Sequence, residues 1–139
     1  MKSRNIFYIA IVLTGMQFFV LVASAQEKNQ PLPPQLYNTM RDSTDYIDVV
    51  FLQGSGGSLS IDVAKSVRFF NTFFDNKPAL KTNAPPTGTI MWLINGREFI
   101  SGNYFTGDSI GYVVLQKDGK EFVSQINEQG NSFFKSKIK

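Results

Sequence analysis

The second half of the chain is constrained most strongly by two tight-turn dipeptides, Asn95-Gly96 and Asp118-Gly119. Each dipeptide separates two runs rich in apolar and β-branched residues. Type I′ turns need positive φ at both central residues, which Asn-Gly and Asp-Gly tolerate well, so each dipeptide predicts a β-hairpin. The strands predicted around the two turns are residues 89–94, 97–105, 110–117 and 120–127. An antiparallel sheet is therefore the expected centre of the fold.

Two further elements are predicted before the hairpins. Residues 46–53 bring Tyr, Ile, Val and Phe close together and predict a first strand, which a glycine-rich break at 54–58 ends. Over residues 62–75 the apolar period changes to three and four, which is typical of a helix. The expected helical stripe consists of Val63, Val67, Phe70 and Phe74. The alternative is that residues 58–63 continue as a strand.

The C-terminal residues 132–138 alternate apolar and basic side chains and predict a fifth strand after the helix. The expected fold class is α+β, with one helix packed on a curled antiparallel β-meander of about five to six strands. This element order resembles the cystatin-like layout, although no stretch matches the inhibitory motifs of that family. An all-β sandwich with Trp92 on a buried strand is the alternative.

The N-terminus has the order of a secretory signal. Lys2 and Arg4 precede the mostly apolar run Ile6–Val22, and the small residues Ala23-Ser24-Ala25 follow. This order predicts a signal peptide over residues 1–25, cleaved before Gln26. The expected location is periplasmic, cell-surface or extracellular, with membrane contact only through the signal before cleavage. The alternative is an uncleaved anchor, because the run approaches the roughly 20 residues that span a bilayer.

Residues 26–45 contain Pro31-Leu32-Pro33-Pro34 and lack a sustained hydrophobic period. Proline runs favour extended polyproline geometry, so this segment is predicted to be an extended leader. Residues 46–139 are then expected to form a single domain.

Composition excludes several kinds of chemistry. The chain has no histidine and no cysteine, which removes the commonest general base, thiolate nucleophiles and structural zinc sites of the usual kind. Without Lys2 and Arg4, 12 of the 14 basic side chains remain, and they nearly balance the 11 acidic ones, which argues against a nucleic-acid partner. We therefore expect no catalytic residues, cofactor or metal, and a protein that is not an enzyme.

Acidic side chains keep one enzymatic alternative open. Glu98, Glu121 and Glu128 lie in the hairpin region, and two converging carboxylates could serve a glycan hydrolase. Each of these residues adjoins a turn or a polar strand face, where a solvated charge is the simpler interpretation.

The sequence thus favours a small, exported binding module whose partner is a protein or a polysaccharide, with inhibition of an extracellular protease as one form of that function. Glycine-rich loops and tyrosines are the candidate contact residues, because loops and amphipathic rings are enriched at recognition surfaces. These candidates are Gly54, Ser55, Gly56, Gly57, Tyr104 and Tyr112. Another alternative is an envelope structural component that pairs with a second chain through a strand ending at Ile138. The sequence does not specify the oligomeric state.

Overall fold

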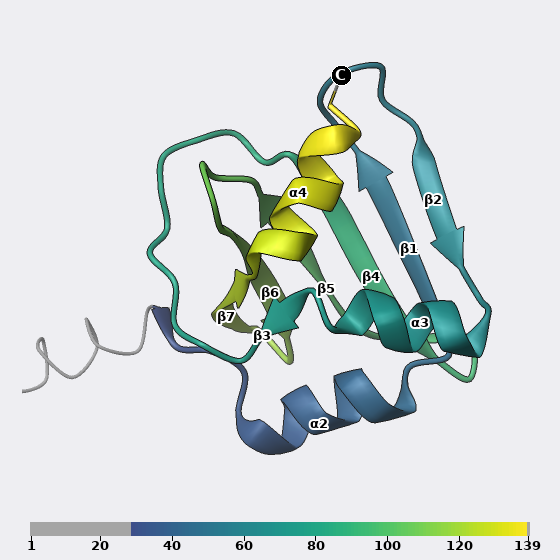
Figure 1. The fold of residues 1–139 in the computed structure, drawn as a ribbon. Helices are drawn as coiled ribbons and strands as arrows, with labels where there is room; N and C mark the ends of the chain where they lie inside the picture. Colours follow the sequence, from purple (N-terminus) through teal and green to yellow (C-terminus); the bar gives the residue numbers. More distant parts are fainter. Residues whose placement is uncertain (1–28, 139) are drawn as a thin grey trace, which may run out of the picture.

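The computed structural model describes residues 29–138, and the predicted signal peptide lies outside them. The described residues form three helices and seven strands, so the fold is α+β (Figure 1). In chain order, the elements are α2 (Pro34–Ser43), β1 (Tyr46–Phe51), β2 (Ser58–Ile61), α3 (Ala64–Asn71), β3 (Phe74–Asp75), β4 (Gly88–Ile94), β5 (Arg97–Phe105), β6 (Gly111–Lys117), β7 (Lys120–Ile126) and α4 (Glu128–Ser136).

All seven strands belong to one curled antiparallel sheet with the order β2-β1-β4-β5-β6-β7-β3. The predicted first strand and all four hairpin strands are present. Strand β2 lies within residues 58–63, for which a strand was the alternative to the start of the helix, and strand β3 was not predicted. The sandwich alternative is wrong because the described strands form a single sheet.

Both predicted hairpin turns are present. Asn95 and Gly96 have φ of 51° and 72°, and Asp118 and Gly119 have φ of 52° and 74°. The ladder between β4 and β5 shifts register between Trp92 and Leu93. Strand β6 is buried on both faces of the sheet: Val113 and Leu115 belong to the main core, and Tyr112 and Val114 to a second apolar cluster.

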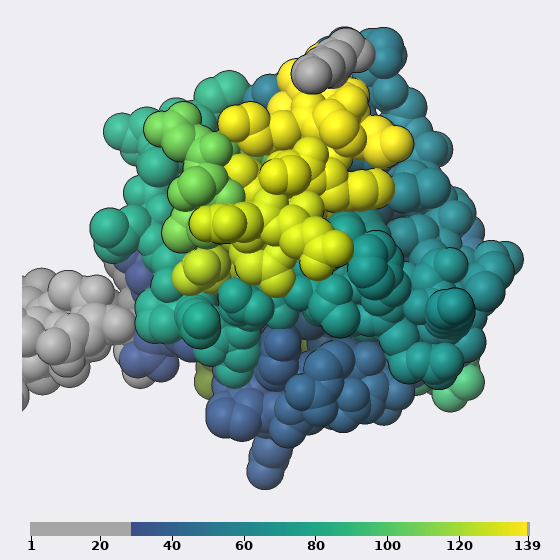
Figure 2. All heavy atoms as spheres, in the orientation of Figure 1, coloured from purple at the N-terminus to yellow at the C-terminus, as the bar shows by residue number. Residues whose placement is uncertain are grey.

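The three helices cover the concave face of the sheet, and the core lies between these two layers. Helix α4 crosses the strands while α3 and α2 lie beyond its N-terminal end, and in space-filling form α4 and α3 close most of this face (Figures 1 and 2). Trp92, Tyr104 and Phe134 are fully buried there, and the Tyr104 and Phe134 rings stack at 4.2 Å between centroids. The helix predicted over 62–75 is present as α3, and its last predicted residues form strand β3 instead.

The prediction of an extended leader over residues 26–45 is wrong for its second half, which forms helix α2. Pro34 occupies the first turn, where its missing N–H needs no partner, and its ring restricts φ to a helical value. Leu32 and Met40 are both buried in the core, and the Tyr37 hydroxyl donates to the Phe74 carbonyl at 2.9 Å. The burial of these apolar side chains explains why the segment folds onto the domain.

The prediction of a fifth hairpin strand over residues 132–138 is also wrong, because residues 128–136 form helix α4. The missed signal is an N-cap. The Asn127 side chain accepts a hydrogen bond from the Gly130 N–H at 3.0 Å, and Glu128 lies in the first turn. Phe134 has no exposed surface in the helix. A strand with the predicted alternation would also have buried Phe134, so the burial of this residue does not distinguish the two structures. The strand-pairing alternative at Ile138 consequently fails.

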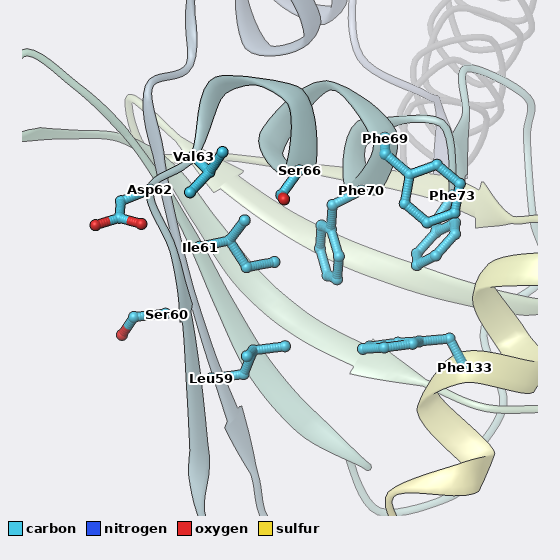
Figure 3. A pocket seen from close by; sticks show the side chains of 10 residues that line it. All are labelled: Leu59, Ser60, Ile61, Asp62, Val63, Ser66, Phe69, Phe70, Phe73 and Phe133. Carbon is cyan, nitrogen blue, oxygen red and sulfur yellow. The ribbon is translucent and has the colours of Figure 1, made fainter.

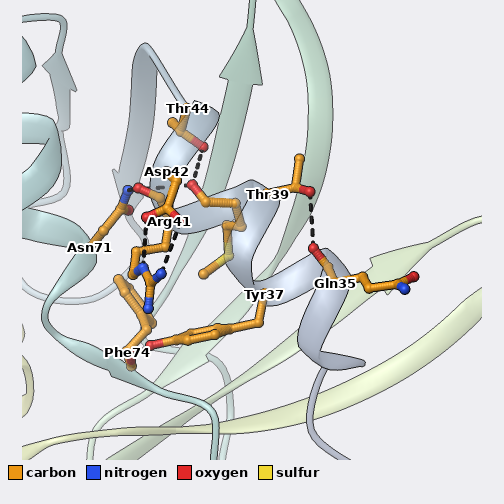
Figure 4. A network of polar contacts seen from close by, with 9 residues as sticks. Gln35, Tyr37, Thr39, Arg41, Asp42, Thr44, Asn71 and Phe74 are labelled. Carbon is orange, nitrogen blue, oxygen red and sulfur yellow. Dashed lines mark hydrogen bonds and ion pairs between the residues drawn. The ribbon is translucent and has the colours of Figure 1, made fainter.

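A buried amide joins the helical layer to the sheet. Asn71 at the end of α3 accepts a hydrogen bond from the Trp92 indole N–H at 2.9 Å. Its amide N–H₂ donates to the carbonyls of Met40 and Arg41 at 3.4 and 3.2 Å (Figure 4). One side chain thus fixes the positions of α2, α3 and β4 relative to one another. Arg41 pairs with its exposed neighbour Asp42 in the same region.

Candidate functional site

The two edges of the sheet differ in their hydrogen bonding. Along β7, the Val123 N–H donates to the Gln30 carbonyl at 2.8 Å, and the Gln125 N–H donates to the Lys77 carbonyl at 3.1 Å. Strand β3 pairs with the last two residues of β7, Gln125 and Ile126. At the opposite edge, β2 pairs with β1, and no strand of the described residues pairs with its outer side. The open edge of β2 is therefore available for another strand.

The phase of the β1–β2 ladder shows which backbone groups are free. The Phe51 N–H donates to the Gly57 carbonyl at 2.9 Å, and Val49 lies opposite Leu59. Because hydrogen-bonded and non-bonded pairs alternate in an antiparallel ladder, Leu59 also bonds towards β1. The backbone N–H and C=O groups of Ser58 and Ser60 consequently point away from the sheet.

Strand β2 lacks the features that protect many edge strands. Natural edge strands commonly carry a charged side chain, a proline or a bulge, which blocks pairing with another chain. The sequence of β2 is Ser-Leu-Ser-Ile, without any of these, and its pairing with β1 is regular over four residues. Leu59 and Ile61 are only partly buried and face the helical layer.

An apolar groove of about 300 Å³ lies between β2, α3 and α4 (Figure 3). Its lining residues are Leu59, Ser60, Ile61, Asp62, Val63, Ser66, Phe69, Phe70, Phe73 and Phe133. In the close-up, the side chains of Leu59 and Ile61 from β2 face Phe133 of α4 across the groove, whereas Ser60 points away from it. Val63 is 61% exposed and Phe69 is 55% exposed. These two side chains lie at opposite ends of the α3 side of the groove (Figure 3), and exposed apolar side chains around one groove are typical of interaction surfaces.

The groove has an acidic end and a basic end. Asp62 follows β2 directly and borders the groove beside the start of α3, with its carboxylate pointing to the same side as Ser60, away from the groove (Figure 3). At the other end, the Lys137 ammonium lies 5.3 Å from the centre of the Phe133 ring. Lys137 belongs to this end because the next residue, Ile138, contacts Gly54 in the loop that leads into β2. Asp62 and Lys137 are both exposed, and neither forms an ion pair with another described residue.

The predicted contact loop Gly54-Ser55-Gly56-Gly57 forms the β1–β2 turn at the basic end of the groove. Gly54 has φ of +75°, and a Cβ at this position would collide with the Ile138 backbone. The backbone conformation and the close approach of Ile138 therefore explain why residue 54 is a glycine. Ser55 and Gly57 are exposed beside the open edge and remain available for contact with a partner.

The two tyrosines predicted as contact residues are buried. Tyr104 has no exposed surface and Tyr112 is 7% exposed, so neither ring has a face available to a partner. Burial raises the pKa of Tyr104 above its ordinary value. The Tyr112 hydroxyl accepts a hydrogen bond from the Thr82 N–H at 3.0 Å and so holds the long β3–β4 loop on the convex face. For these two residues, the prediction of surface contact is wrong.

The carboxylates considered for hydrolysis have separate local partners. Glu98 accepts a hydrogen bond from the Ser101 hydroxyl at 2.6 Å, and Glu121 pairs with Lys81 and Gln116. Glu128 borders a shallow polar hollow beside the N-terminal turn of α4. Over residues 29–138, no group of three acidic side chains is placed to hold a metal ion.

The residues that line the groove were missed as site residues in the sequence. The alternation Ser58-Leu59-Ser60-Ile61 is a period-two signal that predicts a half-exposed strand. Phe69 lies off the buried stripe of α3, which was a sign of a second apolar surface. Their convergence with Phe133 depends on α4, which was predicted as a strand.

Comparison of the chain with protein-family models, curated proteins and solved structures finds no match. Within residues 29–138, none of the helices is both long and apolar enough to cross a membrane.

Proposed function

We propose that this protein is a non-enzymatic interaction module of an exported compartment, which binds an extended polypeptide segment as an additional strand along β2. The observation that carries the proposal is the open edge of β2 beside the apolar groove. Backbone hydrogen bonds to Ser58 and Ser60 supply the general affinity in this mode of recognition. The groove supplies the preference for apolar side chains at alternate positions.

The curvature of the sheet supports this mode of binding. An added strand continues the curl of β2 and brings its inward side chains, opposite Leu59 and Ile61, towards the exposed faces of Val63 and Phe69. This contact removes apolar surface from water, at about 25 cal/mol per Å² buried. The resemblance to the cystatin-like layout concerns the order of elements only, and protease inhibition is the form this function takes if the bound segment belongs to a protease.

A displayed library of random peptides tests the proposal without requiring an identified partner. We expect selection on the wild-type chain to enrich peptides with apolar residues at every second position. Counter-selection uses Ser60→Pro, which removes the outward N–H at a position where an edge strand tolerates proline. Ser60→Ala retains the N–H and is the matched control, so it should bind the selected peptides as the wild type does. Peptides that bind the Ser60→Pro variant equally well would contradict the proposal.

A further inference from the structure

The open edge of β2 is self-complementary. We propose that β2 pairs with β2 of a second copy of this chain in antiparallel orientation, about a two-fold axis at Ser60, and that the two seven-stranded sheets become one continuous sheet. This inference rests on the proposed use of β2 as an interaction edge, and it names one partner for that edge. Two-fold dimers with the same surface on both subunits are the commonest protein oligomers.

The register follows from the phase of the ladder. The outward backbone groups of β2 belong to Ser58 and Ser60, so hydrogen-bonded pairs between two copies must join even-numbered residues. Placing the axis at Ser60 pairs this residue with itself and keeps the whole of β2 in the ladder. An axis at Leu59 also satisfies the phase, but it sets Ile61 against Gly57 and loses an apolar contact.

Side chains match in the register centred on Ser60. Leu59 of each copy lies directly opposite Ile61 of the other, in the non-bonded pairs where side chains approach most closely. Because the axis is perpendicular to the sheet, both copies present their concave faces on the same side. The two apolar grooves then adjoin across the axis, which covers the most exposed apolar side chains beside β2.

The opposite face of the same register is polar. Asp62 of one copy lies opposite Ser58 of the other, and its carboxylate points to the side of Ser60, away from the groove. The symmetric ladder therefore sets Asp62 against a serine in both halves, and no two like charges lie directly opposite each other.

Sedimentation velocity over a concentration series tests the dimer. We expect the purified chain to sediment as a dimer at high micromolar concentration. Ser60→Pro should weaken dimerisation by at least about tenfold, because symmetry removes two outward N–H groups from the ladder. Ser60→Ala retains the N–H and is the matched control, so it should keep the wild-type dissociation constant within about threefold.

A cysteine cross-link tests the register independently. The chain has no cysteine, so a single substitution forms a disulfide only with a second copy. Opposite residues in a hydrogen-bonded pair have Cα atoms about 5.5 Å apart, which suits a disulfide. Ser60→Cys should therefore cross-link under mild oxidation. Ser58→Cys should not, because the two copies of residue 58 lie about four residues apart along the ladder, roughly 13 Å.

The outcomes separate this inference from the proposed function. A wild-type chain that remains monomeric at every concentration overturns the dimer. A Ser60→Pro variant that dimerises as the wild type does, or equal cross-linking at positions 58 and 60, overturns it as well. If the monomeric chain still selects peptides that depend on the Ser60 N–H, the edge binds other segments and only the self-pairing fails. If the dimer forms and no peptide is enriched, the proposed binding of other segments fails instead.

Discussion

The hydrogen bond between Asn71 and Trp92 provides the sharpest test of how the helical layer is held on the sheet. Asn71→Ala leaves the buried indole N–H without its acceptor, which costs about 1–3 kcal/mol. The carbonyls of Met40 and Arg41 lose a donor as well, but at 3.4 and 3.2 Å these bonds are long and weak. We therefore expect the free energy of unfolding to fall by about 2–4 kcal/mol in total.

A double-mutant cycle isolates the contribution of the indole. Trp92→Phe removes the indole N–H, so Asn71→Ala in that background leaves no donor unpaired. The destabilisation caused by Asn71→Ala should then be smaller by about 1–3 kcal/mol than in the wild-type background. Urea unfolding followed by far-ultraviolet circular dichroism measures all four proteins, because Trp92 is the only tryptophan and its fluorescence is lost in two of them. Thr39→Ala is the control: it removes an exposed side-chain bond to Gln35 and should change stability by less than about 0.5 kcal/mol. Additive effects of the two core substitutions would refute the reasoning.

Four further outcomes are expected. Tyr104→Phe removes a buried hydroxyl with no hydrogen-bond partner among the described residues, so urea unfolding should show equal or greater stability, within about 1 kcal/mol. Burial raises the pKa of Tyr104, so the unfolded chain loses this proton first and stability falls as the pH rises above about 10. The melting temperature of Tyr104→Phe should fall less over this range, and an equal fall would contradict the assignment. Gly54→Ala should lower stability by about 1–3 kcal/mol because of its positive φ and the nearby Ile138 backbone, whereas exposed Ser55→Ala should not. Mass spectrometry of natural protein should find Gln26 as the first residue, and an intact initiator methionine would contradict the predicted cleavage.

The strands were predictable where local chemistry specifies them. Asn95-Gly96 and Asp118-Gly119 require positive φ wherever they occur between apolar runs, so both hairpins follow from the sequence alone. The stripe of α3 was predictable for the same reason, because Val67 and Phe70 recur at helical spacing and are buried.

Helices α2 and α4 were not predictable from these signals. Residues 132–138 satisfy the alternation of a strand, but their apolar side chains also form one face of a helix, and Asn127 decides between them by capping the first turn. The proline run before α2 indicated extended structure, and only the burial of Leu32 and Met40 against the domain stabilises the helix that follows.

The candidate site shows the same division. The sequence alone determined that the described part of the chain is an α+β domain built on antiparallel hairpins, because turn chemistry and hydrophobic period act over a few residues. Only the tertiary structure decided which edge of the sheet stays open. The open edge depends on Gln30 and Lys77 covering β7, and the groove beside β2 depends on Phe133 packing against Phe70 and Phe73. These are contacts between residues far apart in the chain. Local propensity carries no information about such contacts, because they form only when the helices pack on the curled sheet.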